Sequence, residues 1–211
     1  MMLRIHGFVS HSLANGPGTR TVIWVQGCRL RCPGCFNQDT HDLNAGQDID
    51  PLRLAAAINS HPVRGVTLSG GEPLLQPEPL TMLLGALSPD KDILLYSGLS
   101  VAEAVKSPAR RAVLLKCDAA LMGRYRDGDR HPYDNKELVI RTACIKAEEL
   151  RPHRAVEVIV GAGRALVTGF PGTERIDTNV PFSRDPGPRL PYHEQRAGAK
   201  APSEFSFRST H

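Results

Sequence analysis

Residues 25–37 read VQGCRLRCPGCFN and place three cysteines, Cys28, Cys32 and Cys35, on one short segment. They follow an apolar run over residues 21–25, which predicts a buried strand. Two glycines and a proline inside the segment predict an irregular loop after that strand instead of a helix. A strand therefore delivers three thiolates onto one loop, and thiolates on a short loop suit zinc or an iron–sulfur cluster.

Three cysteines are one ligand short of a closed four-ligand site, and this shortage leaves several interpretations open. A structural zinc ion would need a fourth ligand, for which His41 is the nearest candidate. A [4Fe–4S] cluster held by three cysteines would keep one iron open to bind another molecule. Redox chemistry at Cys32 and Cys35 is a weaker interpretation, because it leaves Cys28 without a role.

A second motif follows downstream, where residues 65–73 read GVTLSGGEP. This pattern predicts a strand that ends in two glycines, an acid and a helix-starting proline. A C-x3-C-x2-C motif followed by S-G-G-E-P resembles the radical S-adenosylmethionine (SAM) superfamily. The resemblance implies that the three cysteines hold a [4Fe–4S] cluster and that the amino and carboxylate groups of SAM chelate the open iron.

A narrower resemblance covers residues 16–125, roughly half of the chain. Residues 15–20 (NGPGTR), 26–28 (QGC) and 32–37 (CPGCFN) are similar to the small activating enzymes of glycyl radical proteins, and most of all to the anaerobic ribonucleotide reductase activating type. Two features depart from that pattern. Asn15 stands where an acidic residue is common, and residues 131–136 replace a Gly-Ser-x-Asn-Gln stretch.

The resemblance also implies roles for individual residues and partners. Ser69, Gly70, Gly71 and Glu72 would receive the methionyl amino group of SAM, with Glu72 or backbone carbonyls accepting its hydrogens. Phe36 would pack near the cluster or the adenine, or else be a core aromatic residue. A flavodoxin- or ferredoxin-type donor would supply an electron, and a 5′-deoxyadenosyl radical would then take hydrogen from a glycine of a partner protein.

Two other functions stay open at this point. One keeps radical SAM chemistry but changes the substrate to a small molecule, similar to deazapurine synthases. The other is a non-catalytic iron–sulfur or zinc module. Cluster and SAM chemistry of the first kind would be sensitive to oxygen, so anaerobic function is expected.

Apolar runs alternate with helical patterns along much of the chain, which predicts βαβ units and a parallel sheet. The resemblance implies an α/β fold of the incomplete TIM-like (β/α) barrel type, with functional residues at the carboxyl ends of strands. A radical SAM domain is predicted over residues 1–172 and a flexible proline-rich tail over 173–211. Helices are predicted over residues 51–60, 78–87, 101–106 and 146–150, an edge strand over 3–9, further strands over 93–96, 112–115 and 138–140, and a hairpin over 156–167.

Two smaller segments carry predictions of their own. The loop over residues 12–20 contains Gly-Pro-Gly and is either a plain turn or, beside the cysteines, a backbone surface for a cofactor or a peptide. Residues 124–135 are charged and rich in turn formers, so they are either a solvated loop or a lid. Cys117 and Cys144 are expected to be small core residues.

Length and composition limit the classes of protein that need consideration. The 211 residues suit one domain. A net charge of +4 without an aromatic–basic stripe does not favour nucleic acid as a partner. No long apolar stretch is present, so neither a membrane span nor a secretory signal is expected. Five cysteines, three of them clustered, fit a reducing cytoplasm better than a disulfide framework.

Overall fold

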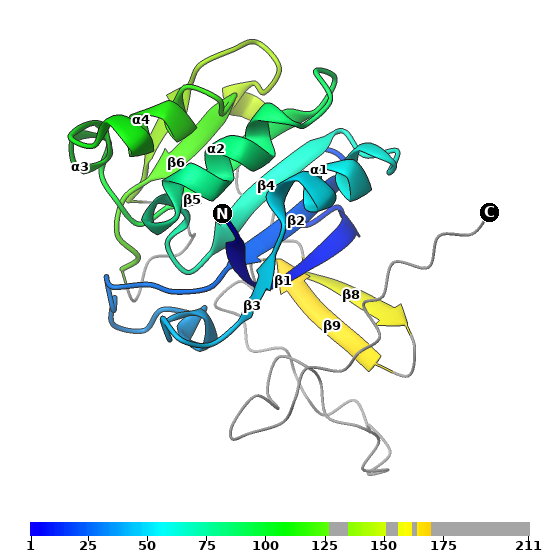
Figure 1. Ribbon diagram of the computed structural model, residues 1–211, viewed down its shortest axis with the longest axis horizontal. Coiled ribbons are helices and arrows are strands. Elements are labelled where there is room, and N and C mark those ends of the chain that lie inside the picture. Colours follow the sequence, from blue (N-terminus) through cyan, green and yellow to red (C-terminus); the bar gives the residue numbers. More distant parts are fainter. Residues whose placement is uncertain (127–134, 151–155, 162–163, 170–211) are drawn as a thin grey trace.

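The computed structural model describes residues 1–126, 135–150, 156–161 and 164–169, which form a mixed α/β fold (Figure 1). Most strands belong to one sheet, and two form a separate hairpin. The strands are β1 (Leu3–Ser12), β2 (Arg20–Val25), β3 (Gln47–Ile49), β4 (Gly65–Gly70), β5 (Asp92–Ser97), β6 (Ala119–Met122), β7 (Glu137–Ile140), β8 (Val156–Gly161) and β9 (Arg164–Gly169). The helices are α1 (Pro51–Asn59), α2 (Pro77–Gly85), α3 (Val101–Val105) and α4 (Pro108–Leu114), with 3-10 turns η1 (Gln38–Thr40), η2 (Pro73–Leu75) and η3 (Ala147–Leu150).

The main sheet has seven strands in the order β3-β1-β2-β4-β5-β6-β7. Its four central strands, β2, β4, β5 and β6, are parallel, which confirms the predicted α/β class and parallel sheet. The strands on either side run antiparallel to their neighbours. The predicted TIM-like barrel is not confirmed, because the described strands form an open sheet with an antiparallel strand at each edge.

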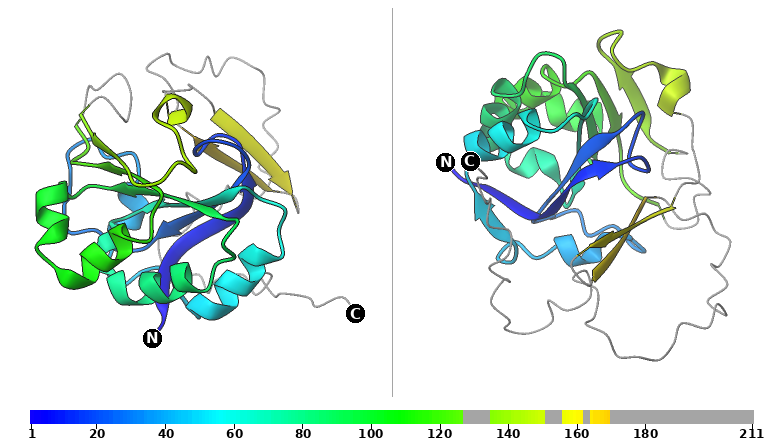
Figure 2. Two further views of the ribbon diagram at one scale, coloured as in Figure 1. Left: turned by 90° about the horizontal axis from the view of Figure 1, so that it is seen from above. Right: turned by 90° about the vertical axis from the view of Figure 1, so that its right-hand side faces the viewer.

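The helices cover one face of this sheet, as Figure 2 shows most clearly in its left view. Alternate residues of the central strands, such as Ile23, Leu68 and Leu95, pack with apolar residues of the helices in the larger core cluster. The intervening residues, among them Leu94 and Tyr96, point to the opposite face and pack against Ile145 and its neighbours. Both faces of the parallel strands are therefore buried, as expected for parallel sheets.

Local sequence accounts for where the helices begin. Asp50 accepts a hydrogen bond from the Leu52 amide at the start of α1, whose predicted position is confirmed. Helices over residues 78–87 and 101–106 are confirmed as α2 and α3. The strand predicted over residues 112–115 is wrong, because this segment ends helix α4, which starts at the Ser107 cap and Pro108. The strand comes later, as β6.

The N-terminal strand is also placed differently from the prediction. Residues 3–9 belong to β1, but β1 lies between β2 and β3, and the short β3 forms the edge. The predicted hairpin is confirmed as β8 and β9, which pair antiparallel. It is attached to the loop before β2, where the Asn15 amide donates to Thr168 Oγ1 over 3.0 Å.

Parts of the predicted domain division lie outside the described residues. The structure does not describe the proposed tail over 173–211 or most of the candidate lid, residues 127–134. The domain boundary at residue 172 therefore stays a prediction. Within the described residues, no helix is both long enough and apolar enough to cross a membrane.

Candidate functional site

The three cysteines lie on a loop, residues 26–42 and hereafter the cysteine loop, whose two ends are joined by backbone hydrogen bonds. The Gly27 amide donates to Thr40 O over 2.7 Å, and the Cys28 amide donates to His41 O over 3.2 Å. Gly27 has φ of 97°, a left-handed conformation that favours glycine, as the chain leaves β2. The loop therefore starts and ends at the carboxyl end of a central strand, where the sequence predicted it.

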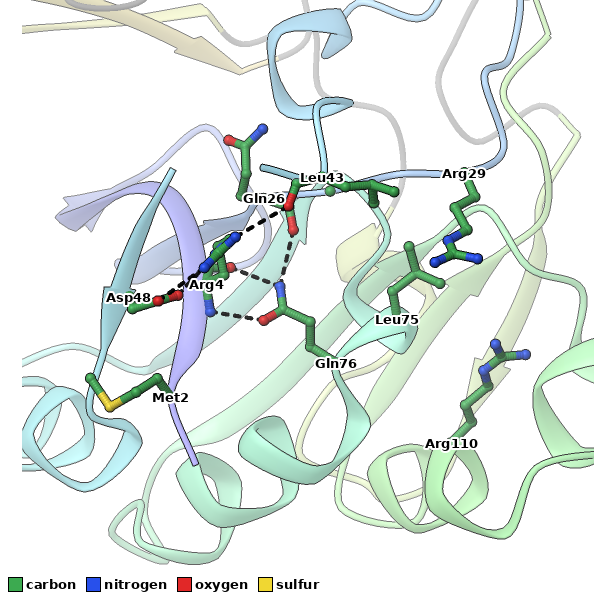
Figure 3. Close-up of a pocket in the computed structure, with 10 residues that line it drawn as sticks. Met2, Arg4, Gln26, Arg29, Leu43, Asp48, Leu75, Gln76 and Arg110 are labelled. Atoms are coloured by element: carbon green, nitrogen blue, oxygen red, sulfur yellow. Dashed lines mark hydrogen bonds and ion pairs between the residues drawn. The ribbon is translucent and has the colours of Figure 1, made fainter. Parts of the chain in front are cut away.

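The two ends of the cysteine loop, hereafter its neck, are also held together by the side chain of Gln26. It is 3% exposed and its Nε2 donates to the carbonyls of Asp39 (3.3 Å) and Asp42 (2.8 Å). Its Oε1 lies 3.0 Å from His6 Nδ1. The Gln26 carbonyl in turn accepts from Gln76 Nε2, the contact drawn in Figure 3. A buried amide with several partners holds a loop in one arrangement, because leaving any of those groups unpaired is costly.

The three thiols are close enough to influence one another electrostatically. Cys28 is buried, whereas Cys32 and Cys35 are half-buried. Burial raises the pKa of the Cys28 thiol, backbone amides of Leu30 and Arg31 lower it by hydrogen bonding, and negative charge on Cys32 raises it. Three sulfurs on one loop, with backbone amides directed at Cys28 and Cys35, are ligands of the kind that an iron–sulfur cluster takes.

The zinc interpretation required His41 to join the cysteines. Among the residues that the structure describes, no three His, Cys, Asp or Glu side chains are grouped so as to hold one metal ion, and this holds for the three cysteines with or without His41. His41 contributes its backbone carbonyl to the neck of the loop, and burial lowers the pKa of its imidazole.

The two sequence motifs meet in the structure. The diglycine turn, residues 70–72, follows β4 and lies against the cysteine loop. Its Gly71 amide donates to Val25 O and its Glu72 amide to Gly27 O, both over 2.9 Å. Asn37 Nδ2 donates to Gly70 O over 3.3 Å. Parallel pairing of β2 with β4 brings both motifs to the same edge of the sheet, as predicted for strand carboxyl ends.

Close backbone approach explains why glycine stands at residue 71. A Cβ there would lie 2.3 Å from Gly27 O and 3.0 Å from Thr40 O, both backbone atoms that cannot rotate away. At Gly70, with φ of 103°, a Cβ would meet the backbone of Trp24 and Val25. The glycines therefore allow the turn to rest on the cysteine loop, a reason that sequence analysis did not identify.

Gly71→Ala is expected to push these two segments apart. Overpacking of this kind costs about 1–3 kcal/mol, and we expect the free energy of unfolding to fall by that amount. Thermal unfolding measures the effect. Gly7→Ala is the matched control, because no atom lies within 4 Å of a Cβ at that position. A stability loss of the same size in Gly7→Ala would contradict the explanation.

Glu72 is turned into the protein. It is 1% exposed, and burial raises the pKa of its carboxyl group. Its Oε1 accepts from the Leu74 amide (3.0 Å) and Ser97 Oγ (2.8 Å), and its Oε2 accepts from the Gly98 amide (2.7 Å). The carboxylate thereby caps η2 and connects the carboxyl ends of β4 and β5.

Two positively charged side chains near the cysteines were not identified from the sequence. Lys136 donates to the carbonyls of Gly123 and Ser97, at the ends of β6 and β5. Its charge lowers the pKa of Cys35 and of Glu72. Arg124 forms a two-bond contact with Glu103, and negative charge on Cys32 helps to raise the pKa of its guanidinium. No local motif marks these residues, because only folding brings them to the loop.

Phe36 is 52% exposed, so its interpretation as a core residue is wrong. Its ring packs edge-to-face on Tyr125, with centroids 5.6 Å apart. Both rings therefore lie on the surface next to the third cysteine.

The Gly-Pro-Gly loop is not beside the cysteine loop. It precedes β2, at the amino end of the strand whose carboxyl end leads to the cysteines. A Cβ at Gly16 would lie 2.9 Å from Arg20 Cδ, so this glycine makes room for a buried arginine. The assumed position of this loop beside the cysteines is therefore wrong, which favours the plain-turn interpretation, and a role as a backbone surface for a peptide stays a prediction.

The two remaining cysteines differ from each other. Cys117 is buried, its Sγ donates to Val113 O, and burial raises the pKa of its thiol to about 12. This agrees with the predicted core role. Cys144 is exposed, so the same prediction is wrong for it.

The chain is similar to one family model and to several known proteins. The model of the family described as 4Fe-4S single cluster domain matches residues 14–141. The anaerobic ribonucleoside-triphosphate reductase-activating protein of Vibrio cholerae is 33% identical over 134 residues, covering 58% of this chain and 84% of that protein. Its counterpart in Salmonella typhimurium is 35% identical over 111 residues, covering 48% and 72%.

Two further matches cover smaller shares. The pyruvate formate-lyase-activating enzyme of Clostridium pasteurianum is 42% identical over 90 residues, covering 40% of this chain and 38% of that enzyme. The crystal structure of QueE from Escherichia coli superposes with a TM-score of 0.39 and 20% identity, covering 46% of this chain and 53% of that one.

Proposed function

This chain belongs to the 4Fe-4S single cluster domain family and resembles the radical SAM activating enzymes, and from that premise we propose that it generates a glycyl radical on a partner protein. The observation that carries the proposal is the contact between the cysteine loop and the diglycine turn, in which the Glu72 amide donates to Gly27 O and Asn37 Nδ2 donates to Gly70 O. A ligand of the cluster's open iron would have to lie at this junction.

The roles that we propose for individual residues follow from the sulfur ligands and positive charges that they provide. When bound, a [4Fe–4S] cluster supplies the electron that cleaves SAM to methionine and a 5′-deoxyadenosyl radical. Cys28, Cys32 and Cys35 would hold that cluster on a loop whose shape is set by the neck and by Gln26. The positive charges of Lys136 and Arg124 would offset the negative charge that the thiolates gather there.

For SAM itself, we propose that Ser69, Gly70 and Gly71 receive the methionyl amino group through backbone carbonyls. Glu72 would act as a positioning residue, since its carboxylate oxygens already accept three hydrogen bonds from the chain. Phe36 with Tyr125 offers an exposed aromatic surface beside Cys35 on which an adenine would pack.

A protein substrate is favoured over a small molecule by the names of the relatives. They activate an anaerobic ribonucleoside-triphosphate reductase or a pyruvate formate-lyase, and each of these is a protein. We therefore propose a glycyl radical enzyme as the partner and a flavodoxin- or ferredoxin-type protein as the electron donor.

Electron paramagnetic resonance of the anaerobically reconstituted, reduced protein tests this function. We expect about four irons and four sulfides per chain, a spectrum that changes when SAM is added, and release of 5′-deoxyadenosine. Addition of a glycyl radical enzyme should then give a glycine-centred radical signal. One zinc per chain without SAM cleavage would instead support a non-catalytic module. SAM cleavage that leaves every such partner unmodified would support a small-molecule substrate.

A further inference from the structure

A pocket of about 540 Å³ lies on the outer side of the cysteine loop, where β1, β3, η2 and α4 approach it (Figure 3). Sites of this size accommodate a small ligand or a side-chain cluster of a partner. Its wall includes Gln26, Gly27 and Arg29, so the backbone on both sides of Cys28 borders the pocket. The pocket therefore borders the first residues of the cysteine loop.

The charges that line this pocket are unequal. Three arginines, Arg4, Arg29 and Arg110, face it together with one acid, Asp48. Arg4 is already neutralised, because its Nε and Nη2 contact the two carboxylate oxygens of Asp48 at 2.9 and 3.0 Å. Two positive charges therefore remain in excess, on Arg29 and Arg110.

The guanidinium groups of these two arginines point toward each other, and Leu75 lies beside them, as Figure 3 shows. Arg110 is half-buried and donates its Nε to Leu74 O over 3.1 Å. Arg29 is exposed, and within the described part of the chain it makes no hydrogen bond or ion pair. Like charges repel when they face each other, so an anionic group placed between these two guanidinium groups would be attracted to both.

We propose that the Arg29–Arg110 pocket is the docking site of a small acidic one-electron carrier protein that reduces the cluster. The inference rests on the proposed function. The carrier loses one electron and the cluster gains it, and no bond is made or broken. A carboxylate of the carrier binds between the two guanidinium groups, and the exposed side chain of Leu43 supplies apolar contact.

The position of the arginines favours a protein over a small free anion. Arg29 projects at the surface and not into an enclosed cage, and Met2, Leu43 and Leu75 supply the apolar part that a protein contact needs. Weak electron-transfer encounters use small interfaces, and charge complementarity acts mainly on their association rates. An open pocket beside Cys28 with two excess positive charges fits such an encounter.

Stopped-flow reduction of the loaded protein by reduced flavodoxin, an acidic carrier, tests the proposal. Arg29→Gln removes one charge without disturbing any contact among the described residues, and Arg29→Gln/Arg110→Gln removes both. At low ionic strength we expect the second-order rate constant to fall about tenfold for the single variant and further for the double. At about 1 M salt the variants and the wild type should converge.

Arg53→Gln on helix α1 is the matched control, because it makes the same charge change on an exposed residue outside the pocket. It should retain nearly the wild-type rate constant. Reduction by photoreduced deazaflavin, which needs no docking, should be equal in all variants, as should iron content.

Three results would overturn the docking site. They are an equal loss in Arg53→Gln, an equal loss with deazaflavin, and unchanged flavodoxin rates in the double variant. If pyrophosphate binds the wild type but not the double variant while flavodoxin rates are unchanged, the pocket belongs to a small anion instead. Failure of the proposed function looks different, since the deazaflavin-reduced wild type would then cleave no SAM, or would give no glycine-centred radical when a glycyl radical enzyme is added.

Discussion

Replacement of Cys32 by alanine is expected to remove the cluster entirely, taking the iron content from about four per chain to near zero and abolishing SAM cleavage. Cys28 and Cys35 would remain, but two thiolates on a loop cannot retain a cluster whose third iron has lost its protein ligand. The backbone bonds at the neck of the loop do not involve this side chain, so the protein should stay folded. Iron and sulfide analysis with circular dichroism measures both outcomes.

The chain contains its own control for that experiment. Cys144→Ala changes an exposed cysteine away from the loop, and the variant should keep full iron content and activity. Because its thiol is buried and bonded to Val113 O, Cys117 is unsuited as a control: its replacement disturbs the core. Retained SAM cleavage in the Cys32 variant, or iron loss in the Cys144 variant, would refute the ligand assignment.

Arg20→Met is expected to produce the largest loss of stability, about 3–5 kcal/mol, because it leaves a buried carboxylate without its closest partner. Arg20 has no exposed surface, and its Nη1 lies 2.5 Å from Asp92 Oδ1 in an ion pair that lacks hydrogen-bond geometry. The guanidinium also donates to Thr67 Oγ1 and to the carbonyls of Pro17 and Val66. Burial lowers the pKa of Arg20, but Asp92 acts in the opposite direction.

Comparison with Arg64→Met distinguishes the effect of burial on stability from the effect of removing a positive charge next to Asp92. Arg64 pairs with the other oxygen of Asp92 at 2.7 Å and with Glu149 at 2.6 Å, but its side chain is 31% exposed. Solvent screens such a pair, so we expect a loss of about 1 kcal/mol in urea unfolding. Equal losses in the two variants would show that charge alone, and not burial, determines the contribution of Arg20.

Local patterns were sufficient for the centre of the site. The apolar run before Cys28 and the strand before Gly70 are continuous in sequence, and parallel pairing brings their ends together without further information. The cap at Asp50 likewise located α1. Each of these features depends on residues near each other in the chain.

The errors arose where tertiary contacts decide the outcome. The sequence AVLL over residues 112–115 has the composition of a strand, yet the Ser107 cap and Pro108 begin a helix that carries it. The real strand, β6, reads AALM, a helix-forming composition that only its pairing with β5 overrides. Glu72 turns inward because the end of β5 supplies two of its three hydrogen-bond donors, and these two residues are distant from Glu72 in sequence.

The hydrogen bonds at the neck of the cysteine loop affect what happens to the protein when it is exposed to oxygen. The ends of the loop are fastened by amides and carbonyls, so they do not depend on iron to stay in place. After oxidative loss of the metal, the cysteine loop should therefore keep its conformation and should not unfold. We expect iron and sulfide to rebuild the cluster in such molecules without refolding of the protein. The loss of activity caused by oxygen should therefore be reversible.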